Sequence, residues 1–190
     1  MESTKKKYVL IIHGGVGTII KGNMTTEKEA AYLETLKISL FEGEKILRNK
    51  GTAINAIEAA ISVMEDSPLF NAGKGAVLTA NETIELDASF MNGSTLDAGA
   101  ISGVSTVKNP ISAAIKVMEN SPHVMLSGRG AEAFAASQDL ELVEPEYFFT
   151  EKMSTKTCVE KTIKNFHVLL FYSVRIYIIG GSLYDRDFKS

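Results

Sequence analysis

Apolar residues recur at helical spacing over the first third of the chain, and this spacing predicts two amphipathic helices. The first begins with a capping-box pattern at residues 26–29, with Thr26 as the N-cap residue, and ends before Gly51. The second begins at Thr52 and ends at Ser67, because the residue before a proline disfavours the helical conformation. The apolar faces expected to enter the core consist of Leu33, Leu36, Leu40 and Leu47 in the first helix, and of Ile54, Ile57, Ile61 and Met64 in the second.

Strands are predicted where apolar residues run together or alternate with polar ones. Residues 8–12 are apolar throughout, as is typical of a strand buried on both faces. In residues 83–91 apolar and polar side chains alternate, which indicates a strand with one buried face. The remaining predicted elements are a strand at 98–107, a helix opened by Asn109 and Pro110, a short strand at 123–126 and a helix at 130–137. Helices interleaved with strands predict a layered α/β or α+β domain.

The character of the sequence changes in its last fifth. Residues 152–164 are polar and rich in Lys, Thr and Ser, which is typical of a linker. Residues 168–179 form a dense apolar run around Arg175 that fits a hairpin arm, a sticky strand or an interfacial helix. We therefore divide the chain into a domain at residues 1–151 and a divergent linker with an apolar tail at residues 152–190.

Composition and charge argue against several classes of protein. The 190 residues are 45% hydrophobic and 23% charged, which is ordinary for a globular domain and argues against disorder. The net charge is −3 and no basic stripe is present, so we expect no nucleic-acid partner. The apolar run at residues 8–12 is too short for a signal peptide, and no segment reaches the roughly 20 apolar residues that span a membrane. We therefore expect a cytoplasmic protein without membrane association.

Metal sites built from side chains and thiol chemistry are not expected either. Cys158 is the only cysteine, so neither an internal disulfide nor a cysteine-based zinc site can form. The three histidines, His13, His123 and His167, are far apart in the sequence and show no ligand spacing.

Two charged segments carry candidate chemistry, each with a structural alternative. Glu85 and Asp87 lie on one face of a predicted strand and can act as an acid–base pair on a sugar. We favour the alternative that they form a solvated strand face. The segment Gly128-Arg129-Gly130 precedes a helix and can bind an anion, or it can simply begin that helix.

Two further candidates lie beside glycines. His13 ends the first predicted strand and can serve as a general base, although we favour a histidine that fixes the following glycine turn. Asn71 lies in a loop at residues 65–78 with glycines at 73 and 75, and it can orient a reacting group or adopt the left-handed conformation. These residues alone predict no more than a soluble α/β domain.

Several motifs occur together and in a specific order. They are His13-Gly14-Gly15, the segment PLFNAGKG at 68–75, ELDAS at 85–89, Ala98-Gly99-Ala100, Lys108-Asn109-Pro110-Ile111 and Ser121-Pro122-His123. Over residues 8–151 they resemble the N-terminal, α-subunit half of the plant-type L-asparaginase and isoaspartyl peptidase family of N-terminal-nucleophile hydrolases. The resemblance implies an α+β fold, an αββα four-layer sandwich of two sheets between helical layers, here incomplete because only the α-subunit portion is matched.

The resemblance also implies an activity. Members are inactive precursors that cleave themselves before the threonine of a Gly-Thr-[Val/Ile]-Gly motif. The freed threonine is the nucleophile and its own α-amino group the base, while the β subunit supplies the oxyanion donors and an Arg–Asp pair that holds the substrate. Aspartate is released from asparagine or from β-aspartyl dipeptides.

To the α half the resemblance assigns supporting roles. His13, Gly14 and Gly15 correspond to a turn beside the cleavage point, and Asn71 to the loop residue nearest the nucleophile. The resemblance implies no organic cofactor but a structural sodium ion, which is a hard cation suited to carbonyl ligands. The backbone carbonyls expected to bind it are those of Met64, Glu65, Ser67, Phe70, Ala72 and Lys74. The implied partner is a β subunit, and the implied assembly is a dimer of αβ units.

One departure from the family bears on activity. Residues 150–190 contain no Gly-Thr-[Val/Ile]-Gly motif, and the likeness stops after Glu151. We therefore expect a chain truncated before the nucleophile and inactive alone, with a tail that a frameshift or read-through can explain. The alternative is a non-catalytic remnant that binds a partner through open sheet edges.

Overall fold

The structure is a computed structural model, and it describes residues 8–14, 24–150 and 175–178. The elements follow one another as β1 (Leu10–His13), α1 (Thr26–Arg48), α2 (Ala53–Glu65), η2 (Gly73–Gly75), β2 (Leu86–Met91), β3 (Ala98–Val104), α3 (Pro110–Asn120), β4 (Met125–Ser127), α4 (Gly128–Ser137), η3 (Pro145–Phe148) and β5 (Arg175–Ile178). The sequence thus predicted each helix and most strands to within a few residues. The predicted linker at 152–164 lies outside the described residues.

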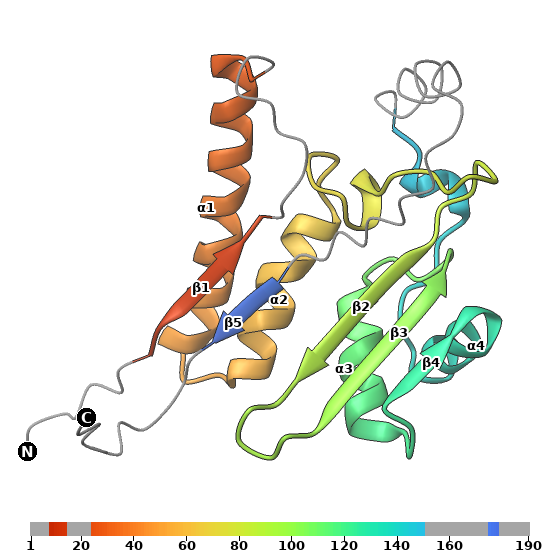
Figure 1. Cartoon of the computed structure of the whole chain (residues 1–190). Coiled ribbons are helices and arrows are strands. Elements are labelled where there is room, and N and C mark those ends of the chain that lie inside the picture. The colour runs from red at the N-terminus through yellow and green to blue at the C-terminus, as the bar shows by residue number, and fades with distance from the viewer. Residues whose placement is uncertain (1–7, 15–23, 151–174, 179–190) are drawn as a thin grey trace, which may run out of the picture.

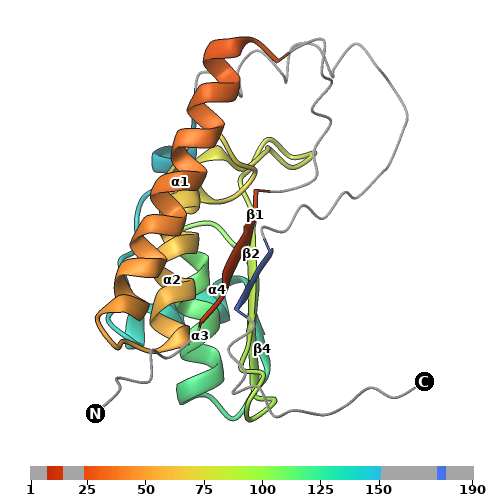
Figure 2. The ribbon, with the colours of Figure 1, turned by 90° about the vertical axis from the view of Figure 1, so that its left-hand side faces the viewer.

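The described elements form a layer of strands with helices on one side (Figures 1 and 2). β2 pairs antiparallel with β3, β3 pairs parallel with β4, and β1 forms an antiparallel pair with β5. β5 falls within the apolar run of the tail, so one of the three conformations left open for that run, a strand, is present there. The mixed α/β architecture agrees with the predicted class, whereas the four-layer sandwich stays a prediction.

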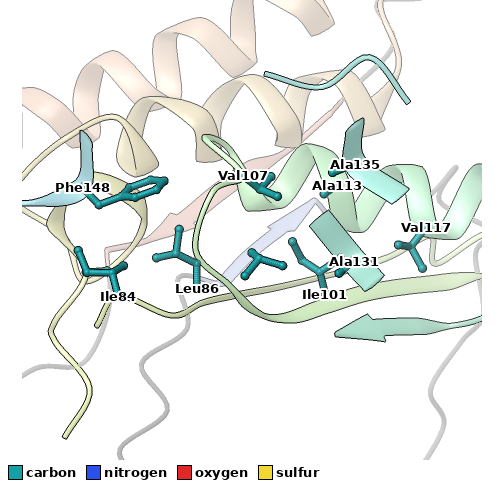
Figure 3. Close-up of a cluster of buried hydrophobic side chains, with 11 residues drawn as sticks. Ile84, Leu86, Ile101, Val107, Ala113, Val117, Ala131, Ala135 and Phe148 are labelled. Carbon is teal, nitrogen blue, oxygen red and sulfur yellow. The ribbon is translucent and has the colours of Figure 1, made fainter. Parts of the chain in front are cut away.

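Helix α3 joins two apolar clusters and is therefore central to the fold. Its residues Ala113 and Val117 enter a cluster with side chains from β2, β3, α4 and η3, which Figure 3 shows. Its residues Ile111, Ala114 and Ile115 enter a second cluster against α2. The buried residues of that second cluster also include Ile57, Ile61, Met64, Phe70 and Phe90.

The predicted leucine stripe of α1 is only partly correct. Leu33 is 60% exposed and Leu40 is 37% exposed, whereas the helix buries Ser39 and Gly43. Small residues occupy the buried face of α1 because α1 and α2 approach each other closely. At this contact the Ser39 Oγ donates a hydrogen bond to Ala60 O at 2.7 Å. The N-cap is also one residue earlier than predicted, since the Thr25 hydroxyl accepts from Lys28 N.

Strand β1 is not buried on both faces in the described part of the molecule. Val9 is 53% exposed and Ile11 49% exposed, while Leu10 faces α1. That prediction is wrong for these residues because helices cover only one side of the strand layer (Figure 2). The alternation predicted for 83–91 is confirmed: Ile84 and Leu86 are buried, and the intervening residues are exposed.

A single carboxylate closes the turn after β3. Glu132 of α4 accepts hydrogen bonds from Ser105 N at 2.7 Å, Thr106 N at 3.0 Å and the Ser105 hydroxyl at 3.1 Å. Burial raises the pKa of Glu132, but these hydrogen bonds outweigh it and the net pKa is lowered. Glu132 therefore stabilises the fold most above the unfolded pKa, and this contribution is lost as pH falls through the folded pKa.

We expect Glu132→Ala to lower the free energy of unfolding by about 1–3 kcal/mol at pH 7, because two backbone N–H groups lose their acceptor. The difference from the parent chain should shrink as the pH is lowered below the ordinary carboxyl pKa of about 4.5. Urea unfolding of the parent chain and of Glu132→Ala at pH 7 and pH 3 measures the loss of stability and its change with pH. A difference that grows on acidification would contradict the assignment.

Candidate functional site

The loop between α2 and β2 is shaped by glycines that lie against carbonyl oxygens. Gly73 has φ +47°, and a Cβ on it would lie 2.3 Å from Glu65 O. A Cβ on Gly75 would lie 2.0 Å from Phe70 O. Only glycine allows these approaches, and so the loop returns over its own start with carbonyl groups facing inward.

The middle of this loop is held by the core and by α1. Phe70 is 3% exposed, and its ring meets the edge of Tyr32 with centroids 5.5 Å apart. The Tyr32 hydroxyl donates to Leu69 O at 2.8 Å. Asn71 follows directly, and its Oδ1 accepts from Val77 N at 2.9 Å. Asn71 is not among the residues of positive φ, so the left-handed interpretation is wrong and its side chain has a fixed orientation.

Gly14, the residue that follows β1, lies against the same loop. A Cβ on Gly14 would be 3.1 Å from Phe70 Cε1 and 3.2 Å from Leu36 Cδ2, so Gly14 packs against Phe70, the residue before Asn71. His13 ends β1 and is exposed. Gly15 lies outside the described residues. The structure therefore brings Gly14 and the loop together, although 55 residues lie between Gly14 and Phe70 in the sequence.

Glu65, the last residue of α2, carries a buried carboxyl group beneath the loop. It is 4% exposed, its Oε1 accepts from Ile111 N at 3.0 Å, and its Oε2 has no hydrogen-bond partner. Burial raises the pKa of Glu65 to about 8, although hydrogen bonds from Ile111 and Asn109 act in the opposite direction. The carboxyl group is therefore mainly protonated at pH 7.

The neighbouring Asp66 continues this connection to α3. Asn109 Nδ2 donates to Asp66 Oδ1 at 3.2 Å. Asn109 has the backbone conformation of an N-cap, as predicted, but its side chain makes no capping hydrogen bond. Within the first turn of α3, the N–H of Ile111 donates instead to the Glu65 carboxyl group.

Tyr147, which lies in η3, contacts the loop and so connects η3 with it. Its ring lies 5.1 Å from Lys74 Nζ and 5.9 Å from Lys108 Nζ, within the range of cation–π contacts. Lys108 also pairs with Glu141 at 2.7 Å. Burial raises the pKa of Tyr147 and the charge of Asp66 raises it further, so the phenol stays neutral. With Phe148 buried beside it, η3 is fixed next to the loop.

The other sequence candidates do not join this site. Asp87 Oδ1 accepts from the Ser102 hydroxyl at 2.7 Å and from Gly103 N at 2.9 Å, which is a structural role. Glu85 is exposed, as expected for a solvated strand face. Arg129 is exposed in the first turn of α4, where Gly128 has φ +50°, in keeping with a helix start.

Metal binding by side chains finds no support in the part of the chain that the structure describes, where no three His, Cys, Asp or Glu residues gather. The backbone carbonyls that are expected to bind a cation lie in or directly before this loop and have neighbours of their own. The carbonyls of Glu65 and Phe70 face glycines whose Cβ would fill the space before them. Those of Met64 and Ala72 accept loop hydrogen bonds from Ser67 N and Gly75 N at 3.2 and 3.1 Å. These contacts hold both carbonyls in the turn.

The sequence matches the family model described as asparaginase over residues 6–171. It is 48% identical to the putative isoaspartyl peptidase/L-asparaginase of Dictyostelium discoideum over 146 residues, 77% of this chain and 42% of that protein. It is also 48% identical to the isoaspartyl peptidase of Escherichia coli over 144 residues, 76% of this chain and 45% of that protein. Identity to the plant-type L-asparaginase of Pyrococcus horikoshii is 51% over 126 residues, 66% of this chain and 40% of that protein.

These relatives are amide and peptide hydrolases by name, and the predicted family resemblance is confirmed. Its predicted end at Glu151 is wrong, because the family match continues to residue 171. The chain belongs to the asparaginase family. It spans less than half of the length of the curated relatives it matches here. None of the helices in the described ranges is long and apolar enough to cross a membrane.

Sequence reasoning missed the side chains that support the loop. Glu65 lies at helical spacing from Ile57 and Ile61, so a carboxyl group on an apolar stripe was the available signal. No pattern in the sequence pointed to the contact of Tyr147 with Asp66 and Lys74, because these residues are more than 70 positions apart.

Proposed function

We propose that these residues form the α-subunit-like portion of a threonine hydrolase that releases aspartate from asparagine or β-aspartyl dipeptides. Family membership supports the reaction class. The observation that carries the proposal is the contact between Gly14 and Phe70 in the loop, because these residues belong to the two segments that the resemblance expects to support the site. Asparagine and β-aspartyl peptides both fit the proposal.

In this proposal the threonine nucleophile and its oxyanion donors come from a β portion. The described residues position them. Val77 N holds Asn71 Oδ1, which leaves the Asn71 amide hydrogens to donate toward the nucleophile or the charge that develops on it. Gly14 has no side chain, which allows Phe70 and Leu36 to pack directly against it.

A sodium ion is proposed in the loop, held by the carbonyls of Met64, Glu65, Ser67, Phe70, Ala72 and Lys74. Its chemistry would be structural: a bound cation neutralises the converging carbonyl dipoles. Fixing this loop fixes Asn71, which lies within it. The hydrolytic step itself requires no metal in this scheme, since the nucleophile's own amine acts as base.

The side of the strand layer on which none of the described helices lies supports a β portion as partner. Val9 and Ile11 of the first strand region, Met91 of β2 and Met125 of β4 are each about half exposed or more. Between Met91 and Met125 lie the small residues Ala98 and Ala100. A face with such side chains suits a second packed sheet. The dimer of αβ units and the cytoplasmic location stay predictions, and no described feature specifically favours the non-catalytic alternative.

A hybrid precursor tests the proposal. Residues 8–150 of this chain would replace the aligned portion of the Escherichia coli isoaspartyl peptidase, to which they are 48% identical. We expect the purified hybrid to cleave itself into two fragments, the second beginning with threonine by N-terminal sequencing. A hybrid with that threonine changed to alanine is the control. A folded hybrid that stays intact would contradict the proposed supporting role.

The same proposal makes the isolated 190-residue chain inactive, because residues 150–190 contain no Gly-Thr-[Val/Ile]-Gly motif. Release of aspartate by this chain alone, at a rate near that of an intact relative, would show that the nucleophile has been misassigned.

A further inference from the structure

Two consecutive side chains tie the end of α2 to the beginning of α3. Glu65 Oε1 accepts from Ile111 N at 3.0 Å, and Asp66 Oδ1 accepts from Asn109 Nδ2 at 3.2 Å. Residues 65 and 66 begin the loop, and residues 109–111 form the start of the helix that joins both apolar clusters. The start of the loop is therefore anchored to the most central element of the fold.

The Glu65 carboxyl group is an unusual choice for this position. It is 4% exposed and its Oε2 has no hydrogen-bond partner, and both Met64 and Ile111 beside it are buried. A buried polar atom without a partner costs stability, and an apolar residue would avoid that cost. The residue therefore needs a role that an apolar side chain cannot fill, and the hydrogen bond to Ile111 N is such a role.

The residue that accepts this hydrogen bond also carries one of the backbone carbonyls expected to bind the cation. The Glu65 side chain points to α3 while its backbone oxygen points to Gly73, whose Cβ would lie 2.3 Å from it. Because both groups belong to one residue, fixing the side chain limits rotation of the Glu65–Asp66 peptide plane. The Asp66–Asn109 contact restrains the other end of the same peptide.

We propose that Glu65 is a positioning residue for the loop cation site: its side chain, with the Asp66–Asn109 contact, holds the Glu65 carbonyl toward the bound ion. This inference rests on the sodium site of the proposed function. It adds a function for a side chain in a site whose ligands are otherwise expected to be backbone atoms.

Sodium-dependent melting of the full 190-residue chain tests the inference. Melting temperatures are measured in NaCl and in choline chloride at equal ionic strength, over a series of sodium concentrations, because a ligand of the folded state raises the melting temperature. Glu65→Leu removes the side-chain oxygen that accepts from Ile111 N but still fills the space of the side chain. Glu65→Gln keeps an acceptor oxygen at this position. Val117→Ala, in the other apolar cluster, is a control for general loss of stability.

We expect the parent chain, Glu65→Gln and Val117→Ala to share one half-saturating sodium concentration. In Glu65→Leu this concentration should rise at least tenfold. If Glu65→Leu does not fold, Asn109→Ala serves instead, because it removes the contact with Asp66 and leaves the hydrogen bond from Ile111 N to Glu65 in place, and a rise of several-fold is expected.

Unchanged sodium dependence in Glu65→Leu or Asn109→Ala, with only a lower melting temperature, would overturn the positioning role. Absence of any sodium-specific stabilisation in the parent chain would overturn the cation site and the inference with it. Neither result would touch the hydrolase proposal, because self-cleavage of the hybrid is measured separately.

Discussion

Gly99→Ala is expected to be the most destabilising single substitution that adds only one methyl group. An alanine Cβ at this position would lie 2.2 Å from Ala114 O and 2.4 Å from Met118 N. Both are backbone atoms of α3, and they cannot move away from the added methyl group by changing a rotamer, as a side chain can. Since α3 joins the two apolar clusters, β3 and α3 must separate along their contact. Overpacking of this kind costs about 3 kcal/mol or more, a large part of the stability of a small domain.

Urea unfolding followed by circular dichroism measures the effect of Gly99→Ala. Gly93→Ala is a matched control, because nothing lies within 4 Å of a Cβ built on Gly93. We expect that control to stay within about 0.5 kcal/mol of the parent chain. Equal stability of the two variants would mean that β3 does not pack on α3 as described.

Gly75→Ala is expected to have the largest effect on the candidate site. Its Cβ would lie 2.0 Å from Phe70 O and 3.0 Å from Pro68 O, so the loop has to open. We expect a loss of about 2–3 kcal/mol in the free energy of unfolding. The sodium-dependent rise in melting temperature should disappear, and a hybrid that carries the change should not cleave itself.

Gly130→Ala provides the comparison for Gly75→Ala. It lies in the first turn of α4 with nothing within 4 Å of the added Cβ, and alanine there should stabilise slightly. Normal sodium dependence in Gly75→Ala would contradict the carbonyl site, even if the variant were less stable. Loss of sodium dependence in both variants would show that the measurement reports overall stability.

The elements that sequence predicted well are those in which periodicity and packing agree. In α2, the residues Ile57, Ile61 and Met64 share a helical face and are buried together. Strand β2 follows its period of two in the same way. In α1 the packed face is formed by Ser39 and Gly43, because close approach of two helices favours small residues over leucine. A hydropathy pattern cannot reveal this, since it depends on the partner helix.

The sequence predicted the glycine-containing loop of the candidate site, but it did not predict the side-chain contacts that support this loop. Gly73 and Gly75 were visible because glycines after a proline mark a turn, and the family resemblance gave Asn71 a role. The contacts of Glu65 with Ile111 and of Tyr147 with Asp66 depend on tertiary structure between distant segments. The sequence records them only as an acidic residue on an apolar face and an aromatic residue near the end of the domain.

Hydrolysis by the hybrid precursor tests the central claim most directly. The initial rate of aspartate release from a β-aspartyl dipeptide would be compared between the hybrid and the intact Escherichia coli isoaspartyl peptidase under the same conditions. If residues 8–150 supply the support that the family requires, the hybrid should reach a rate within about tenfold of the relative, a difference of about 1.4 kcal/mol in activation free energy. A folded, self-cleaved hybrid with no measurable release of aspartate would contradict the account.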